Sequence, residues 1–468
     1  MYIKQLYTNC LSEAAYYIES NGEAAVIDPL RDIDSYLQLA KERNCTIKYI
    51  FETHFHADFV SGHLDLAKVT NAPIVFGPNT VTKFPVHVAK DGEVFRLGNI
   101  SLEVLHTPGH TLESTCYLLK DESGTNHAVF TGDTLFVGDV GRPDLSSGDI
   151  TTDELAGLMY ESLQAKIIPL EDEVIVYPAH GPGSSCGKNL GPDTFSTIGE
   201  QKKSNYALQP QTKEEFVKAV TEGLQDAPTY FAINAKINKE GYDSLDSVLE
   251  TGLTPLSIEE FKQKIDEDVI VLDTRKAAEF TQGFVPGSIS IGLEGRFAEW
   301  AGNLLPFNKP MMLVTEEGKE RESVVRLARV GFSKIEGFLK GGYEGWKSAG
   351  ETSDIIIDIE ADELAMDIPF DDKLVVIDVR KEVEFADGHV KGAVNIPLGT
   401  MIDPAVSMGN IEDTDNLYIH CAGGYRSVIA ASLLKRQGIH NLRNVLGGWG
   451  KIKDEAKIET EKEAAVLN

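Results

Sequence analysis

The first half of the chain alternates short apolar runs with stretches whose apolar residues recur at helical spacing. Runs rich in β-branched and aromatic residues predict strands, and a spacing of three or four residues predicts helices near 33–40 and 153–165. The polar motifs of this region follow directly after predicted strands, where α/β scaffolds present their chemistry. The pattern therefore predicts a mixed α/β domain. Its strands are expected at 24–28, 47–51, 74–76, 100–105, 114–119, 127–131 and 173–177.

The second half contains an internal repeat. The segment 271–276 matches 376–381, so that Asp273 and Asp378 stand 105 residues apart. Solenoid repeats run only about 20 to 50 residues, so this period indicates two tandem copies of one small domain. We place a first domain at 1–245, the two copies at 254–350 and 358–455, and a charged segment at 456–468 that is expected to form a solvated helix or tail.

Composition narrows the class of protein. The 468 residues suggest roughly three domains, and no apolar run reaches the roughly 18 residues of a membrane helix. The N-terminus shows no secretory pattern, and five scattered cysteines suit a reducing compartment, so we expect a cytoplasmic protein. A net charge of −29 argues against nucleic acid as a partner.

A dense group of metal-ligand residue types follows the strand at 47–51. The loop holds His54, His56 and Asp58 within five residues, which is rarely structural. Three more residues of the same kind follow later strands in the segments 107–111, 130–134 and 177–181: His110, Asp133 and His180.

This series of motifs resembles the metallo-β-lactamase superfamily, and more narrowly its persulfide dioxygenase branch, across residues 1–245. The resemblance implies an αββα sandwich with metal at one edge. The departure is Phe59, which stands where the dinuclear zinc hydrolases of the superfamily carry a histidine ligand. A phenyl ring cannot coordinate, and this disfavours a two-metal hydrolase.

The resemblance to the dioxygenase branch implies one metal held by His54, His110 and Asp133. Two histidines and one carboxylate suit non-haem Fe(II), one ion per chain, better than zinc, and leave positions open for reactants. The remaining residues, His56, Asp58 and His180, are expected to orient the ligands or hydrogen-bond the substrate; their alternative is direct ligation in a zinc enzyme.

Three residues near these motifs are candidates for substrate binding. Arg142 could bind an anionic thiol carrier, although an Arg–Asp pair with Asp144 that holds the loop is an equal alternative. Cys186 stands six residues after His180 and could handle persulfide, although unpaired cysteines are more often small buried hydrophobes. Tyr177, at the start of its motif, completes the set.

The second copy of the repeat carries a thiol between a strand and a helix. The segment 421–427 places Cys421, Gly423, Gly424 and Arg426 between a strand at 417–420 and a helix at 428–437. Backbone N–H groups, the helix dipole and a guanidinium there favour a thiolate and an anionic sulfur adduct. The loop resembles that of the rhodanese family, Cys-x-x-Gly-x-Arg, whose central sheet is parallel. Arg380 is a further candidate for substrate binding.

The first copy keeps this scaffold without its chemistry. The segment 315–321 has no cysteine and so cannot form a persulfide, which suggests a spacer or docking role. Phe284 also stands where the second copy has His389.

The combination resembles bacterial fusions of a persulfide dioxygenase with rhodanese modules that act in sulfide detoxification. The resemblance implies oxidation of a low-molecular-weight persulfide by oxygen to thiol and sulfite, with Cys421 exchanging sulfane sulfur with sulfite or thiosulfate. Two alternatives remain open: a thioester hydrolase of the glyoxalase II type and a non-oxidative sulfur-relay protein. The sequence leaves open the thiol carrier (glutathione, coenzyme A or bacillithiol), the direction of transfer and whether the chain forms a homo-oligomer.

Overall fold

The computed structural model describes residues 1–145, 150–188, 190–224, 226–409, 411–412 and 414–463. Two compact units make up the chain: Met1–Ser247 with Leu327–Ser333, and Val248–Arg326 with Lys334–Asn468. Among the described residues, no helix is both long and apolar enough to cross a bilayer.

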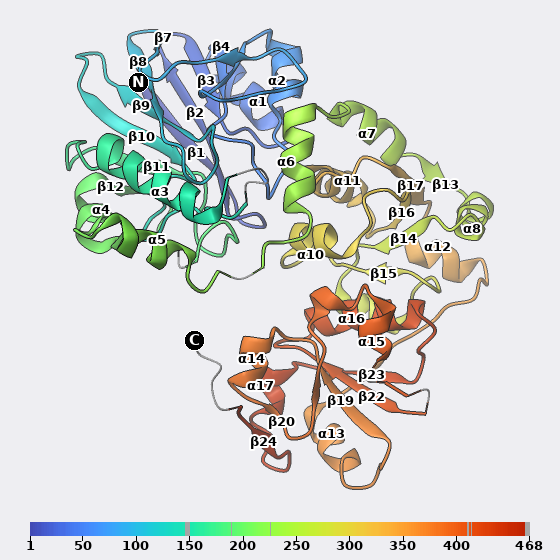
Figure 1. Cartoon of the computed structure of the whole chain (residues 1–468). Helices are drawn as coiled ribbons and strands as arrows, with labels where there is room; N and C mark the ends of the chain where they lie inside the picture. Colours follow the sequence, from blue (N-terminus) through green and yellow to red (C-terminus); the bar gives the residue numbers. More distant parts are fainter. Residues whose placement is uncertain (146–149, 189, 225, 410, 413, 464–468) are drawn as a thin grey trace. The chain divides into compact units, whose positions relative to one another are not determined.

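Two six-stranded sheets form the first unit (Figure 1). The first sheet has the order β1 (Tyr2–Thr8), β2 (Glu13–Ser20), β3 (Glu23–Ile27), β4 (Thr46–Phe51), β5 (Ile74–Phe76), β6 (His87–Val88). The second has the order β12 (Ser196–Thr197), β11 (Ile175–Pro178), β10 (Asn126–Gly132), β9 (Thr115–Lys120), β8 (Ile100–His106), β7 (Val94–Leu97).

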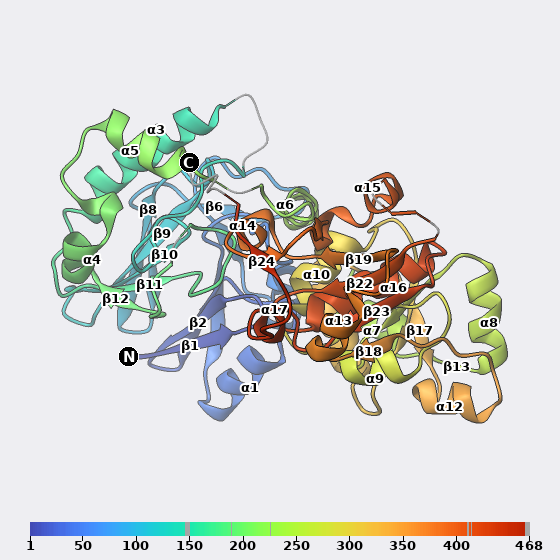
Figure 2. The same ribbon diagram turned by 90° about the horizontal axis from the view of Figure 1, so that it is seen from below.

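Helices flank these sheets. Figure 2 shows α3 and α5 lying together beside the second sheet. Thr151 caps α3 because its hydroxyl accepts from Glu154 N–H at 3.2 Å, while Glu154 Oε2 accepts from Thr151 N–H at 2.8 Å. The helices and turns are α1 (Asp34–Glu42), α2 (His63–Thr70), α3 (Thr152–Ser162) with a π-helical end η1 (Leu163–Ile167), α4 (Ile198–Ser204), η2 (Tyr206–Leu208), α5 (Lys213–Thr221), α6 (Phe231–Glu240) and α7 (Leu245–Gly252).

Three hydrophobic layers hold the first unit together. The layer between the sheets is aromatic, with Phe51, Tyr117 and Phe130 fully buried. Tyr36 of α1 packs in the cluster on the outer face of the first sheet, and Met159 of α3 packs in the cluster on the second. Each such side chain contributes about 1.5–3 kcal/mol of burial free energy. This layering is the αββα sandwich, and the prediction of it is confirmed.

The second unit holds the two copies of the repeat, each with a five-stranded parallel sheet of the same strand order. The first sheet is β13 (Pro255–Leu256), β17 (Ile335–Leu339), β16 (Met311–Val314), β14 (Ile270–Asp273), β15 (Ile289–Ser290). The second is β18 (Ile357–Ile359), β23 (Leu442–Val445), β22 (Asn416–His420), β19 (Leu374–Asp378), β21 (Val394–Asn395). The predicted parallel sheets are thus confirmed.

The helices of the two copies also correspond. Those of the first are α8 (Ile258–Asp266), α9 (Ala277–Gln282), α10 (Phe297–Leu304), α11 (Glu320–Arg329) and α12 (Gly342–Ser348). Those of the second are α13 (Ala361–Asp367), α14 (Glu382–Ala386), η3 (Leu398–Thr400), α15 (Pro404–Met408), α16 (Tyr425–Arg436) and α17 (Trp449–Ile452).

The charged segment was predicted at 456–468 as a solvated helix or tail. Residues 464–468 lie outside the described residues, and the described part, up to residue 463, differs from that prediction. Thr460–Glu461 forms a short strand, β24, which pairs antiparallel with β20 (His389–Val390). Lys391 N–H donates to Glu459 O at 2.9 Å, and Gly392 N–H donates to Glu461 Oε1 at 3.0 Å. The segment therefore satisfies edge backbone groups that would otherwise face solvent.

Candidate metal centre and sulfur-transfer loop

Three buried side chains that follow different strands converge in the first unit. His54 follows β4, His110 follows β8 and Asp133 follows β10, and their ligand atoms lie within 4.8 Å of one another. His54 Nε2 lies 3.8 Å and His110 Nε2 3.4 Å from Asp133 Oδ2. The three residues that the sequence singled out as ligands thus form one cluster.

A glycine allows two of these loops to approach each other. Gly132 precedes Asp133 with φ of 51°, a region that side chains other than glycine rarely adopt. A Cβ at Gly132 would lie 2.5 Å from Thr53 Oγ1, which is closer than any real contact. The Gly-Asp pair is therefore needed to bring Asp133 against the loop of His54.

Hydrogen bonds fix which nitrogen of each histidine faces the cluster. His110 Nδ1 donates to the carbonyl of Arg142 at 2.7 Å, so Nε2 is left to ligate. Thr53 Oγ1 donates to Asp28 Oδ2 at 2.8 Å, and therefore accepts from His54 Nδ1 at 3.0 Å. Asp28 thus orients a ligand through Thr53.

The cluster fits a bound cation. Both carboxylate oxygens of Asp133 and Nε2 of His180 are buried, and no described residue gives them a hydrogen bond. A buried polar atom without a partner costs about 1–3 kcal/mol, and more when it is charged. Burial, with the neighbouring imidazoles, holds the pKa of His54 well below its usual value and keeps it neutral, as a ligand must be.

His56 lies beside His54, with ring centroids 4.2 Å apart, and contacts two carboxylates. Its Nε2 lies 3.1 Å from Asp28 Oδ1 and 3.5 Å from Glu52 Oε2. Burial alone would lower the pKa of His56, but the carboxylates of Asp28 and Glu52 prevail and raise it to about 10. Phe59 lies beside it, with ring centroids 4.3 Å apart. Phe59 has no donor atom, whereas a nitrogen of His56 also lies with ligand atoms of Asp58 and His180 in a group that spans no more than 4.8 Å.

Three further predicted residues lie next to Asp133. His180 Nε2 is 3.5 Å from Asp133 Oδ1 and 3.6 Å from Asp58 Oδ2. Cys186 is buried, and its sulfur lies with atoms of Asp133 and His180 within a span of 4.8 Å. Burial, with Asp58 and Asp133, raises the pKa of the Cys186 thiol well above its usual value. The structure therefore brings the side chain of Cys186 to the metal centre.

The side chains of Arg142 and Tyr177 both contact other side chains of the protein. The guanidinium of Arg142 is buried and donates to both oxygens of Asp144 at 2.7 Å, the loop-holding arrangement that was the alternative to anion binding. The ring of Tyr177 stacks on Phe130, with centroids 5.3 Å apart, at the margin of the core between the sheets. The substrate-binding roles predicted for Arg142 and Tyr177 stay predictions.

The sequence analysis missed Asn238, a buried residue of α6 that supports the metal-binding loop. Its Nδ2 donates to the carbonyls of His56 and Phe59 at 2.8 Å each, and its Oδ1 accepts from Ser61 N–H at 2.9 Å. Asn238 lies almost 180 positions away along the chain, so spacing could not reveal it. A polar residue on the buried face of an amphipathic helix was the one available signal.

In the second unit, β22 leads into the predicted sulfur-transfer loop. Cys421 is 1% exposed, and its sulfur accepts from Gly424 N–H at 3.1 Å. Gly424 precedes the first residue of α16 as its N-cap and has φ of 107°, a conformation that favours glycine. Arg426 donates to both carboxylate oxygens of Glu384 at 2.7 and 2.8 Å. The N–H of Gly424 therefore contacts the Cys421 sulfur, while the guanidinium of Arg426 is paired with the carboxylate of Glu384.

Arg380 is part of a structural pairing that both copies share. It binds Asp378 through two nitrogens, donates to Gly388 O at 2.6 Å and lies over the ring of Trp449. Arg275 repeats these contacts with Asp273, Gly283 and Tyr343 in the first copy, which has no thiol. The same contacts in a copy without the chemistry indicate a scaffold role.

The exchange of Phe284 for His389 is also explained by packing. Phe284 stacks on Phe280 with centroids 4.1 Å apart, and His389 stacks on Phe385 at 3.6 Å. Both rings fill the same place in their copies.

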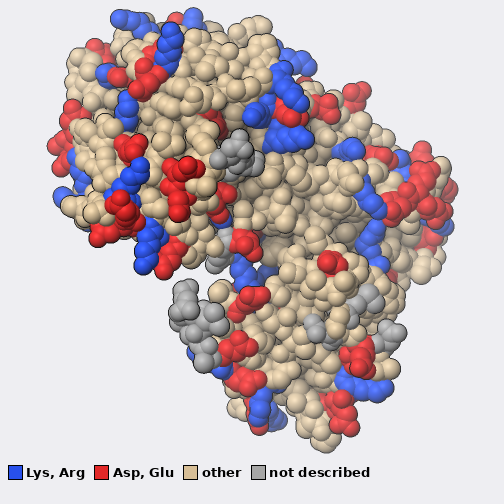
Figure 3. Space-filling view, viewed as in Figure 1, with Lys and Arg blue, Asp and Glu red and all other residues tan. Residues whose placement is uncertain are grey.

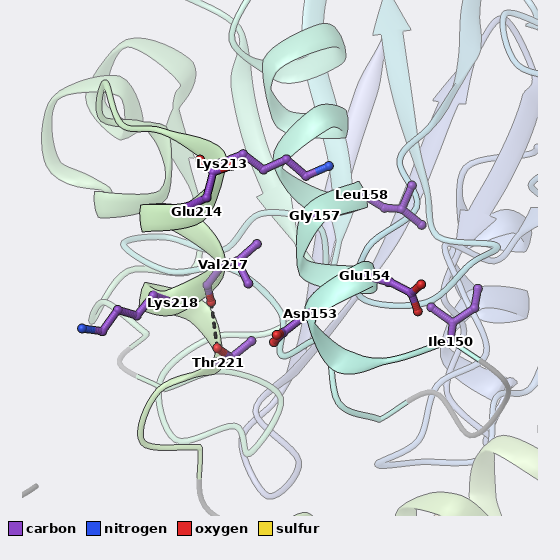
Figure 4. A pocket seen from close by; sticks show the side chains of 10 residues that line it. All are labelled: Ile150, Asp153, Glu154, Gly157, Leu158, Lys213, Glu214, Val217, Lys218 and Thr221. Carbon is purple, nitrogen blue, oxygen red and sulfur yellow. Dashed lines mark hydrogen bonds between the residues drawn. The ribbon is translucent and has the colours of Figure 1, made fainter.

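Away from the metal centre, a groove of about 920 Å³ runs between α3 and α5 (Figure 4). Leu158 and Val217 supply apolar surface, and charged side chains such as Asp153 and Lys218 stand beside them. None of the candidate site residues lines it. On the face drawn in Figure 3, lysine and arginine side chains stand among aspartates and glutamates instead of forming a continuous band.

Fold and site together define the class of protein: an enzyme whose αββα domain binds metal at the ends of its strands, joined to two small parallel α/β domains. The model of the Metallo-beta-lactamase superfamily matches residues 8–180, and that of the Rhodanese-like domain matches 257–349 and 360–455. The chain belongs to the metallo-beta-lactamase superfamily and carries two rhodanese-like domains behind its metal-binding domain.

Named relatives agree with this assignment. A metallo-beta-lactamase structure from Staphylococcus aureus is 32% identical with a TM-score of 0.64, covering 73% of this chain and 98% of that one. Glyoxylase B2 of Dictyostelium discoideum is 31% identical, over 45% of this chain and 74% of its own length. A probable hydroxyacylglutathione hydrolase of Schizosaccharomyces pombe is 32% identical over 35% of this chain, and the match spans only 60% of the yeast protein.

Proposed function

We propose that the chain is a mononuclear non-haem Fe(II) persulfide dioxygenase coupled to a sulfurtransferase. The proposed reaction converts a low-molecular-weight persulfide, oxygen and water to the corresponding thiol and sulfite. The observation that carries the proposal is the cluster of His54, His110 and Asp133, which offers two histidines and one carboxylate. Phe59, packed against His56, adds no donor atom for a second ion.

That donor set suits a single Fe(II) ion, which when bound supplies open coordination positions and one-electron chemistry toward oxygen. The protein's own contribution is orientation. Thr53 and the Arg142 carbonyl hold the imidazoles of His54 and His110, so that both Nε2 atoms point at Asp133. Such outer hydrogen bonds typically change metal affinity or activity by about 10–100-fold.

Residues beside this set could receive the persulfide. His180 Nε2 lies 3.5 Å from Asp133 Oδ1 and 3.6 Å from Asp58 Oδ2, and the sulfur of Cys186 lies within 4.8 Å of ligand atoms of Asp133 and His180. In its thiol form, Cys186 can donate a hydrogen bond to an anionic terminal sulfur. We propose this donor role for Cys186.

Sulfur transfer is proposed at Cys421. The thiolate attacks the sulfane sulfur of a donor, a new S–S bond forms, and the leaving group departs with the electron pair. Gly424 N–H lies on the sulfur and can stabilise the charged adduct. The same chain carries this loop and the proposed dioxygenase domain. Sulfite made at the metal centre and sulfane sulfur held on Cys421 can therefore combine to thiosulfate, and the linker between the domains sets the effective concentration of one site at the other.

Hydrolysis of a glutathione thioester is the second candidate, because two of the relatives are named as hydroxyacylglutathione hydrolase and glyoxylase. Metal analysis and an oxygen electrode separate the two. We expect about one iron per chain and oxygen uptake with glutathione persulfide, coenzyme A persulfide or bacillithiol persulfide. Two zinc ions per chain, hydrolysis of S-lactoylglutathione and no oxygen uptake would refute the dioxygenase proposal.

Two variants test the division of labour. Cys421→Ser should abolish transfer of sulfur from thiosulfate to cyanide while leaving oxygen uptake intact, and His110→Ala should do the opposite. Cys45→Ser is the matched control, since Cys45 is partly exposed beside Glu19 and belongs to neither site. Loss of both activities in either variant would contradict two separate sites.

A further inference from the structure

The arginine of the sulfur-transfer loop stands between two residues that contact the Cys421 sulfur. Gly424 N–H donates to this sulfur at 3.1 Å, and the thiol lies 3.7 Å from Ser427 Oγ. Arg426 lies between these two positions, in the first turn of α16. Residues 422–423 of the loop are exposed, so the loop is open to solvent. A donor that brings its sulfane sulfur to Cys421 therefore comes close to Arg426.

The guanidinium of Arg426 already binds a carboxylate. Its Nη1 and Nη2 donate to Glu384 Oε2 and Oε1 at 2.7 and 2.8 Å. These nitrogens form one edge of the guanidinium, and such an edge binds an oxyanion through two parallel hydrogen bonds. Glu384 is itself held in place, because its Oε2 also accepts from Lys381 N–H at 3.1 Å and so caps α14. The side chains of Arg426 and Glu384 are 16% and 33% exposed, so a ligand can reach the pair.

A second arginine beside the loop is also engaged. Arg380 binds both oxygens of Asp378 and donates to the carbonyl of Gly388 at 2.6 Å. Asp378 lies beside His420, the residue before Cys421, where β19 pairs with β22. This arginine is buried and holds the scaffold of the copy. An oxyanion that arrives at Cys421 therefore has to compete with Glu384 for the terminal edge of Arg426.

We propose that Glu384 is a specificity-determining residue of the sulfur-transfer site, because it competes with the oxyanion groups of thiosulfate and sulfite for Arg426. Thiosulfate carries its sulfonate directly on the sulfane sulfur, and the sulfonate has to displace Glu384 to gain a two-point contact. An alkyl persulfide has no oxygen on either sulfur, so it needs no such contact beside Gly424 N–H. The inference rests on the proposed sulfur transfer at Cys421 and deepens it by naming persulfides as the favoured donors.

The chemical step is a displacement at sulfur with either donor. With thiosulfate, the Cys421 thiolate bonds to the sulfane sulfur, the bond to the sulfonate sulfur breaks, and sulfite leaves with the electron pair. With 2-hydroxyethyl persulfide, the thiolate bonds to the terminal sulfur and the bond to the inner sulfur breaks. The inner sulfur leaves with the electron pair and takes up the proton of the persulfide, which gives 2-mercaptoethanol and an anionic persulfide on Cys421.

The first test measures anion binding apart from chemistry, in the full-length protein carrying Cys421→Ser. Isothermal titration with thiosulfate gives the Kd, and Glu384→Gln should lower this Kd by about three- to tenfold, because glutamine offers Arg426 only one neutral oxygen. Titration with sulfite should show the same shift. When Arg426→Gln is also present, Glu384→Gln should change the Kd by less than about twofold, because the two side chains act as one pair.

Glu363→Gln is the matched control for the helix cap. Glu363 accepts from Glu360 N–H at 2.8 Å and so caps α13, as Glu384 caps α14. In the part of the chain that the structure describes, no hydrogen bond or ion pair joins Glu363 to an arginine. Glutamine keeps the cap at both positions, so Glu363→Gln should leave the Kd for thiosulfate unchanged.

The second test follows persulfide formation on Cys421 in a single turnover by intact mass, with Cys421→Ser as the blank. Glu384→Gln should raise the rate constant per molar donor by about three- to tenfold for thiosulfate and by no more than about twofold for 2-hydroxyethyl persulfide. Equal changes for the two donors, a Kd for thiosulfate that does not fall, or a fall that persists without Arg426 would overturn the inference while the proposed function stands. A wild-type protein that takes sulfur from neither donor would overturn the proposed function, and the inference with it.

Discussion

Replacing Asn238 by alanine should loosen the metal-binding loop without removing any side chain of the cluster. The amide of Asn238 makes three hydrogen bonds to backbone groups of residues 56–61, and the residue is 1% exposed. These bonds hold the turn that carries Phe59 and that sets the direction of His56. Losing them leaves two carbonyls and one N–H without their partner, in a part of the loop where His56, Phe59 and Ser61 are fully buried.

The magnitude follows from the number of groups. Each buried backbone group left unsatisfied costs about 1–3 kcal/mol, and water entering the space of the lost amide recovers part of this, so we expect a loss of about 3–5 kcal/mol in unfolding free energy. That is a large share of the 5–15 kcal/mol typical of a domain. Iron affinity should fall by about 10–100-fold, as for other outer hydrogen bonds at metal sites.

Urea unfolding of the protein with and without metal, together with competitive iron titration, measures both effects. Asn234→Ala is the matched control: Asn234 lies one turn earlier in α6, is fully buried, and has no hydrogen-bond partner among the described residues for either side-chain atom. Its replacement should cost no more than about 1 kcal/mol, because no hydrogen bond is lost. Equal losses in the two variants would refute a role for the Asn238 hydrogen bonds.

Three further predictions concern single positions. Phe59→His should raise the metal content from one to two ions per chain, because it adds a donor next to Asp58. If mass spectrometry finds an unchanged metal content, Phe59 does not determine the number of ions bound. Gly424→Ala should lower the unfolding free energy by about 1–2 kcal/mol, because alanine is strained at the positive φ of this position, and it should also reduce sulfur transfer. Denaturant unfolding and a sulfur-transfer assay on the same variant measure the two effects. No change in either quantity would contradict the prediction. Burial lowers the pKa of His420, so its stabilising contribution is present above the unfolded value near 6.5 and is lost as pH falls through the folded pKa. Below pH 6.5, the slope of unfolding free energy against pH should therefore be smaller in His420→Asn than in the unchanged protein, by up to about 1.4 kcal/mol per pH unit. Equal slopes in the two proteins would exclude His420 as a source of acid sensitivity.

The sequence predicted much of the scaffold, and its misses have identifiable causes. The run at 47–51 and the strand before Cys421 fall within one residue of β4 and β22, because isoleucine and aromatic residues in both runs favour strands. Strand β1 and helix α2 were not predicted. The burial of β1 is only partial along its length, and α2 carries polar residues such as His63 on a face that the fold buries. Tertiary packing overrides local preference at such places.

The sequence by itself determined which chemically reactive residues are present and in what order. It contains the order of the metal-binding motifs, the absence of an imidazole at Phe59, the repeat, and the presence of a thiol in only the second copy. These are local facts, because a motif within one loop keeps its residues close whatever the rest of the chain does.

Only the tertiary structure decided which of these residues act together. In the structure, Asp28 and Glu52 contact His56, and Arg142 pairs with Asp144. Asn238 donates a hydrogen bond to the metal-binding loop, and Tyr425 donates one to the carbonyl of Gly292. Most of these partners are separated by tens to nearly two hundred positions, and the direction of a side chain depends on the packing of sheets and helices around it. Spacing along the chain carries no information about such contacts, and for that reason the donor set of the metal centre follows from the fold.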